Sequence, residues 1–130
     1  HGQSVTSSAG ETVTPDQVLG AKRQGRKFSF VTDTLYTPSI ADEVRGSDLF
    51  ICEGMFADDV ADQALEKKHM TARQAAKLAR AAQVKKLALI HYSPRYTDHD
   101  LSILLREAQS EFSDTVLTRD RMAFELPYEE

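Results

Sequence analysis

The stretch KKLALIH, residues 85–91, consists of two lysines, four apolar residues and a histidine. A short apolar run bounded by polar residues is typical of a buried strand. Two similar runs come earlier in the chain, FSFV at 28–31 and DLFIC at 48–52. Helical patterns lie between them, most clearly at 58–68 and 71–82. Strands that alternate with helices predict an α/β fold with a largely parallel sheet covered by helices.

Shorter elements complete the prediction. Thr14 and Gln17 form a capping box around one helical turn that ends at Gly20, and Pro38 begins a short helix that ends at Gly46. Residues 1–13 are expected to be a loop or an edge hairpin, and Asp98 is expected to cap a further helix. Strands are expected at 115–117 and 122–126. The buried stripe predicted for the helix at 58–68 is Val60, Ala61, Ala64 and Leu65. The stripe predicted for the helix after Asp98 is Leu101, Leu104, Leu105 and Ala108.

Length and composition limit the class of protein. The chain has 130 residues, of which 41% are hydrophobic and 28% charged, which fits one globular domain and excludes wholesale disorder. No apolar run approaches the roughly 20 residues that cross a bilayer, so no membrane span is expected. The single cysteine, Cys52, excludes an internal disulfide, is expected to be a core thiol, and favours a reducing, cytoplasmic location. The chain begins at His1 without a methionine, which indicates a piece of a longer protein.

The net charge of −4 limits the possible partners. A protein that binds nucleic acid through many phosphates normally has a broadly basic surface, which this composition does not favour. A local basic rim remains open, and its candidate residues are Lys22, Arg23, Arg26 and Lys27.

Polar residues follow each of the predicted strands. Asp33 comes after the first strand, Glu53 after the second and His91 after the third, while His69 lies in the break between two helices. The carboxyl ends of parallel strands share one edge of the sheet, where α/β proteins place their sites. We therefore expect these four side chains to converge there.

Each of these residues also has a simpler interpretation. Asp33 fits a turn or a helix cap, and Glu53 fits a solvated loop acid. His69 fits a surface histidine, and His91 a buried histidine with its hydrogen bonds satisfied. Taken together, carboxylates and imidazoles favour a site for a metal ion or a phosphate. Catalytic zinc takes about three protein ligands, whereas only two are clear here, so the sequence predicts half of a metal site.

Several blocks of sequence, in order, carry a resemblance to a known family. They are TPDQVLG at 14–20, GRK at 25–27, TDT at 32–34, ICEGMF at 51–56, HMTA at 69–72 and HYSPRY at 91–96. Together they resemble the C-terminal half of ribonuclease Z, the metallo-β-lactamase-fold endonuclease that removes 3′ trailers from precursor tRNA. The resemblance covers nearly the whole chain.

The resemblance implies a fold, cofactors and partners. It implies that residues 1–130 are a single partial domain, the C-terminal half of an αββα sandwich whose sheet is flanked by helices. It also implies a zinc-dependent enzyme with two ions in the complete site, manganese or iron being alternatives. The expected partners are precursor tRNA, a second copy in a homodimer, and an N-terminal half in the same or another chain. This chain alone is expected to be inactive.

The resemblance also assigns roles to residues of this chain. Asp33 corresponds to an aspartate that bridges two zinc ions, and His91 to a histidine that ligates one of them. His69 corresponds to a histidine that contacts the scissile phosphate and protonates the leaving oxygen, with Glu53 orienting it. Ser93 and Arg95 lie where a phosphate of the RNA would be held.

The chain departs from the family pattern at several positions. Thr32 replaces a glycine, Cys52 a histidine and Met70 a serine, while Gly54-Met55 replaces Ala-Thr. These changes leave open a metallo-β-lactamase-fold hydrolase that acts on a small phosphodiester or another ester. A third alternative, of a different class, is a non-catalytic interaction or dimerisation module.

Overall fold

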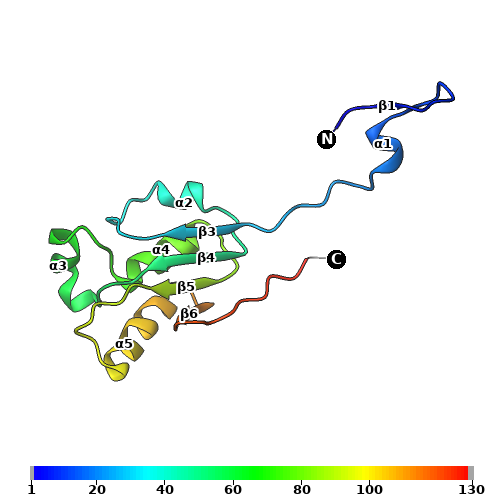
Figure 1. Ribbon diagram of the computed structural model, residues 1–130. Coiled ribbons are helices and arrows are strands. Elements are labelled where there is room, and N and C mark those ends of the chain that lie inside the picture. Colours follow the sequence, from blue (N-terminus) through cyan, green and yellow to red (C-terminus); the bar gives the residue numbers. More distant parts are fainter. Residues whose placement is uncertain (1, 129–130) are drawn as a thin grey trace.

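The computed structural model describes residues 2–128, and its centre is a four-stranded sheet (Figure 1). The strands are β3 (Phe28–Val31), β4 (Leu49–Glu53), β5 (Leu87–Ile90) and β6 (Thr115–Leu117), in that spatial order. All three neighbouring pairs are parallel. The prediction of a parallel α/β sheet is confirmed, and every carboxyl end points to the same edge.

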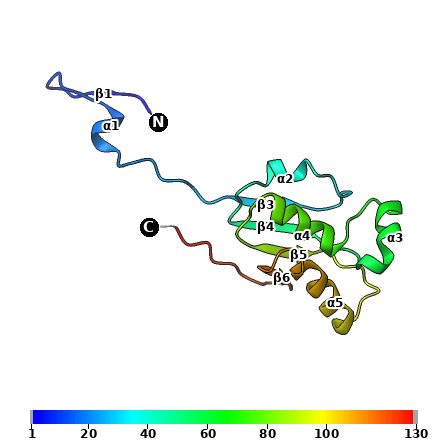
Figure 2. The same cartoon turned by 180° about the vertical axis from the view of Figure 1, so that it is seen from behind.

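Helices cover one face of this sheet. They are α2 (Ile40–Glu43), α4 (Ala72–Ala81) and α5 (Asp98–Gln109), and Figure 2 shows α4 and α5 in front of the strands. The core lies between them and the sheet, where Phe50 and Leu89 pack with Leu78 and Leu104. Leu104 and Ala108 of the predicted stripe on α5 are buried, and Leu101 and Leu105 are partly buried. The cap is Thr97 rather than the predicted Asp98, because the Thr97 hydroxyl accepts from the Asp100 amide.

Helix α4 packs closely on the sheet because its inner face is alanine. Ala72, Ala75, Ala76 and Ala79 are all fully buried. Its capping box is present: Thr71 Oγ1 accepts from the Gln74 amide at 3.2 Å, and Gln74 Oε1 accepts from the Thr71 amide at 2.9 Å. A Cβ atom at Gly54 would lie 3.2 Å from the Ala72 Cα, so glycine is needed where β4 meets the start of this helix.

The opposite face of the sheet is open. Phe28 and Phe30 point to this face and are each 56% exposed, and Ile51 and Ile90 are partly exposed. A hollow of about 390 Å³ on this face lies between these strands and Met122 and Phe124 of the C-terminal segment. Neighbouring exposed phenylalanines on a sheet form an apolar patch, and such patches are typical of interaction surfaces.

Four further local predictions differ from the structure. The segment 58–68 is split into η1 (Asp58–Val60) and α3 (Ala61–Glu66), since the backbone at Val60 is not helical and Lys68 has a φ of 59°. Its predicted stripe fails as well, because Ala64 is buried but Leu65 is 68% exposed, Ala61 is exposed and Val60 only partly buried.

The other two differences are a shorter helix and a missing strand. Helix α2 is shorter than the predicted segment 38–46, because the chain turns at Gly46, where φ is 67°. Residues 122–126 form no strand, because a turn with the Met122 amide on the Arg119 carbonyl at 3.0 Å leads the chain away from β6.

The first residues form a separate unit at the end of a linker. β1 (Val5–Thr6) and β2 (Thr12–Val13) pair in an antiparallel hairpin outside the main sheet, followed by the one-turn helix α1 (Pro15–Val18). In Figures 1 and 2 this unit lies away from the sheet. Over residues 2–128, no helix combines the length and apolar character that a membrane span requires.

Candidate metal centre

Two strands of the sheet end in a left-handed residue that carries a metal-ligand side chain. Asp33 has a φ of 53° and follows β3, and His91 has a φ of 59° and follows β5. Aspartate and histidine occur in this region more often than most residues other than glycine, and such strained conformations cluster at functional sites. The turn out of each strand thus places a donor at the sheet edge.

Three side chains converge at this edge. Asp33, His69 and His91 each offer one ligand atom, and these atoms all lie within 4.8 Å of one another. Oδ1 of Asp33 lies 3.8 Å from Nδ1 of His91, and the rings of His69 and His91 meet edge to face at 5.3 Å. His69 comes from the segment between α3 and α4. One divalent ion can therefore be reached by donors from three separate segments.

Glu53 lies behind His69 and is fully buried at the end of β4. Its Oε2 accepts from Nδ1 of His69 at 2.9 Å and from the Met70 amide at 3.4 Å. Its Oε1 accepts from the Thr34 amide at 2.7 Å. An ionised carboxylate accepts only, so Nδ1 of His69 donates to Glu53, and Nε2 is the ring nitrogen left for another partner. Glu53 is not the solvated loop acid of the simpler interpretation.

Sequence reasoning did not find the polar neighbours of these residues. The Thr34 and Met70 amides hold Glu53, but backbone donors leave no signal in residue type. Thr32 places its hydroxyl 3.5 Å from Nδ1 of His91. In the sequence, Thr32 stands out only because it replaces a glycine of the family pattern.

Ser93 and Arg95 lie on the loop after His91 but outside the cluster. Ser93 is mostly buried, and its amide donates to the Met55 carbonyl at 3.0 Å. Arg95 donates to Oε1 of Gln63 at 2.7 Å, and its guanidinium carbon lies 5.4 Å from the centre of the Phe56 ring. In this structure Arg95 is thus directed towards α3 rather than towards Asp33 and His91.

Cys52 and Met70 contact each other beneath the site. Both are fully buried, and the thiol of Cys52 donates to the Met70 sulfur at 3.7 Å. Burial raises the pKa of the Cys52 thiol, and the adjacent Glu53 carboxylate raises it further. The thiol therefore stays protonated and serves packing, as expected for a core cysteine.

The family model and the curated relative that the chain matches belong to the same superfamily. Residues 4–92 match the model of the β-lactamase superfamily domain. The chain is 57% identical over 129 residues to a ribonuclease Z from Treponema denticola, which covers 99% of this chain but 42% of that protein, in its C-terminal part. The chain thus spans less than half the length of this curated relative.

Two solved structures share the fold. One is a metallo-β-lactamase fold protein, YhfI from Bacillus subtilis, with a TM-score of 0.61 and 26% identity over 69% of this chain and 35% of that one. The other is the short form of human tRNase Z, with a TM-score of 0.61 and 24% identity over 89% of this chain and 37% of that one. The sheet and its helices therefore have the arrangement found in metallo-β-lactamase-fold proteins.

Proposed function

Because the chain belongs to the β-lactamase superfamily, we propose that it is the C-terminal part of a metal-dependent endoribonuclease of the ribonuclease Z type. Its reaction is the removal of the 3′ trailer from precursor tRNA. The observation that carries the proposal is the convergence of Asp33, His69 and His91 at one sheet edge, with Glu53 behind His69. The 57% identity to a ribonuclease Z supports the choice of reaction.

The donor set fits a divalent transition metal. One carboxylate and imidazole nitrogens suit zinc, and also manganese or iron. Asp33 and His91 would be the ligands that this chain supplies, and the other ligands would come from an N-terminal half in the same or another chain. When bound, the metal supplies Lewis-acid stabilisation of the charge on the phosphate.

His69 and Glu53 form the acid–base pair of the reaction. Glu53 accepts the Nδ1 hydrogen of His69, which fixes the orientation of the ring and directs Nε2 to the site. A proton held at Nε2 is then available to the leaving oxygen when the RNA is cleaved. Ser93 and Arg95 are proposed to hold a neighbouring phosphate. In that role the Arg95 guanidinium releases the Gln63 side chain and donates to a phosphate of the RNA instead.

The open face of the sheet is where the N-terminal half is proposed to pack. Phe28 and Phe30 on this face would be buried between two sheets of an αββα sandwich. The complete protein is further proposed to be a cytoplasmic homodimer, as in the family it resembles.

The test uses the full-length protein that contains this chain. It is expected to release the trailer from precursor tRNA in the presence of Zn²⁺, and chelation with EDTA should abolish that activity. The 130-residue chain alone is expected to bind zinc poorly and to cleave nothing. A His91→Ala variant that retains full activity would overturn the assignment.

A second function is favoured by the changed residues around the site. The Cys52–Met70 contact lies directly behind Glu53 and His69, where the family pattern has polar residues. This favours a hydrolase of a small phosphodiester as the alternative. Comparing kcat/KM on precursor tRNA and on bis(p-nitrophenyl) phosphate separates the two functions.

A further inference from the structure

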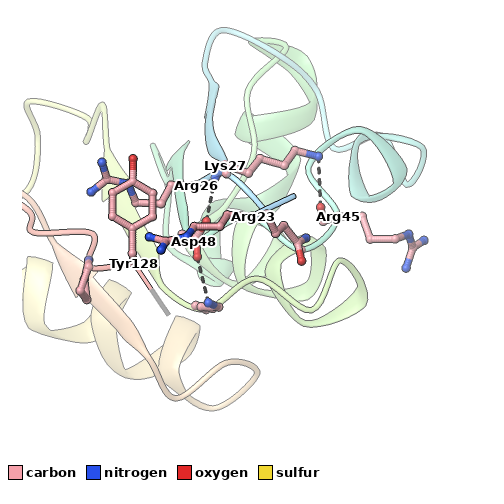
Figure 3. A pocket seen from close by; sticks show the side chains of 11 residues that line it. Arg23, Arg26, Lys27, Arg45, Asp48 and Tyr128 are labelled. Atoms are coloured by element: carbon pink, nitrogen blue, oxygen red, sulfur yellow. Dashed lines mark hydrogen bonds and ion pairs between the residues drawn. The ribbon is translucent and has the colours of Figure 1, made fainter. Parts of the chain in front are cut away.

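A basic pocket lies at the edge of the sheet opposite the candidate metal centre. In Figure 3, Arg23, Arg26 and Lys27 line the pocket beside Asp48, and the Lys27 side chain runs away from Asp48 towards the backbone of Arg45. The pocket has a volume of about 400 Å³ and is formed where the linker before β3, the start of β4 and the C-terminal segment meet. Its charged lining residues are Arg23, Arg26, Lys27, Arg45, Lys85 and Asp48.

Positive charge is in excess in this pocket. Five cationic residues and one carboxylate line the pocket, an excess of four positive charges, although the chain as a whole has a net charge of −4. Asp48 accepts from the Lys27 amide at 2.7 Å and pairs with Nζ of Lys85 at 2.9 Å. These two contacts, the amide first, lower the pKa of Asp48, so its single negative charge is already engaged.

Arg26 and Lys27 are held by groups that carry no charge. Arg26 donates to the Leu126 carbonyl and stacks on the Tyr128 ring at 4.1 Å. Nζ of Lys27 donates to two backbone carbonyls at the end of α2, at 2.6 and 3.1 Å. Arg23 makes no hydrogen bond or ion pair with the part of the chain that the structure describes. Their positive charge is therefore available to an anion.

Arg45 contributes a more weakly engaged cation. It pairs with Asp42 at 2.6 Å, but both side chains are more than half exposed. An exposed pair of this kind contributes little in water and exchanges readily for a stronger anion. Arginine is also the side chain best suited to phosphate, because its planar donors bind two oxygens at once.

We propose that this pocket binds a backbone phosphate of the RNA substrate, an inference that rests on the proposed function. Lys27 and Asp33 lie at opposite ends of β3, and six residues at about 3.3 Å each place them roughly 20 Å apart. Only an RNA that extends several nucleotides from the cleaved bond reaches both sites. A small phosphodiester occupies the metal centre alone.

The experiment compares Arg23→Glu with Lys77→Glu in the full-length protein. Lys77 is exposed on α4, so the two variants change the net charge equally. Binding of a mature tRNA, which lacks a trailer, is measured by fluorescence anisotropy between 50 and 200 mM salt. Hydrolysis of bis(p-nitrophenyl) phosphate is measured in parallel.

Arg23→Glu is expected to raise the Kd for tRNA about tenfold and to reduce the slope of log K against log salt by about one unit. Lys77→Glu is expected to change the Kd less than about twofold. Both variants should hydrolyse the small phosphodiester at the rate of the unmodified protein. Equal Kd values and slopes for the two variants would overturn the proposal.

The two proposals fail in different ways. If the unmodified protein cleaves precursor tRNA but the variants bind tRNA equally, the pocket has no role and the proposed function stands. If it cleaves no precursor tRNA while Arg23→Glu alone weakens tRNA binding, the phosphate site stands and the proposed function is wrong.

Discussion

Nδ1 of His69 lies 2.9 Å from the fully buried carboxylate of Glu53, and that carboxylate also accepts from the Thr34 and Met70 amides. Three segments of the chain thus meet at one buried acid: the end of β4, the turn after β3 and the segment 69–70. Its position explains how a histidine from the break between two helices is held at the edge of a sheet.

Glu53→Gln is expected to lower activity on precursor tRNA about 10- to 100-fold, because an amide cannot accept at both ends and the His69 ring loses its fixed orientation. The free energy of unfolding should fall by about 1–3 kcal/mol, since one buried donor loses its acceptor. Cleavage assays and urea denaturation of the full-length protein measure both effects. Unchanged cleavage would remove Glu53 from the mechanism.

Zinc is expected to stabilise the full-length protein through Asp33. At a hundredfold excess over its Kd, a bound ligand adds about 2.7 kcal/mol, which raises the Tm by several degrees. Asp33→Ala should lose most of this rise and lose only about 1 kcal/mol of stability in EDTA, because the side chain is mostly exposed and the remaining cost is that of an alanine at a φ of 53°. Asp62→Ala, another exposed carboxylate, is the control. A zinc-induced rise that survives in Asp33→Ala would show that the ion binds elsewhere.

Gly54→Ala is expected to destabilise the protein by about 1–3 kcal/mol, because the added Cβ would meet the Ala72 Cα and the Leu89 side chain, each at 3.2 Å. Gly20→Ala is the matched control, since nothing lies within 4 Å of a Cβ there. Urea denaturation compares the two variants. Equal unfolding free energies would mean that α4 can move away from β4 at no cost.

The elements that local sequence patterns define were predicted well. The apolar runs gave β3, β4 and β5, and the Thr71 capping box gave the start of α4. The strand at 122–126 was wrong because a strand needs a neighbour, and a turn after β6 takes this segment away from the ladder. Pairing partners are a property of the whole fold, which an alternating pattern does not encode.

The site was predictable in outline because the carboxyl ends of parallel strands share an edge. That rule brings Asp33 and His91 together from positions far apart in the chain. The rule does not predict the direction of a side chain, so it does not predict the contact of Arg95 with Gln63. The stacking of Arg26 on Tyr128, a hundred or so residues later, has no local signal either.

Asp48 is expected to stabilise the fold in a pH-dependent way. Its pKa in the folded protein is lowered by the Lys27 amide and then by Lys85, so its contribution is present above the unfolded pKa. That contribution is lost as the pH falls through the lower, folded value. Asp48→Asn should therefore destabilise the protein at pH 7, and the difference should shrink in acid. Urea titrations at pH 7 and at pH 4 and below measure it, and a constant difference would contradict this account.

Phe30→Ser is the prediction that tests the open face of the sheet. If an N-terminal half covers this face in the full-length protein, replacing a buried phenylalanine by a small polar residue should cost about 3–5 kcal/mol of unfolding free energy. Leu65→Ser is the control, because Leu65 is also an exposed apolar residue, at 68% against 56%, but lies on α3 away from this face. It should change stability by less than about 0.5 kcal/mol. Similar small losses for both variants would mean that the sheet face stays in water and that the sandwich is not formed there.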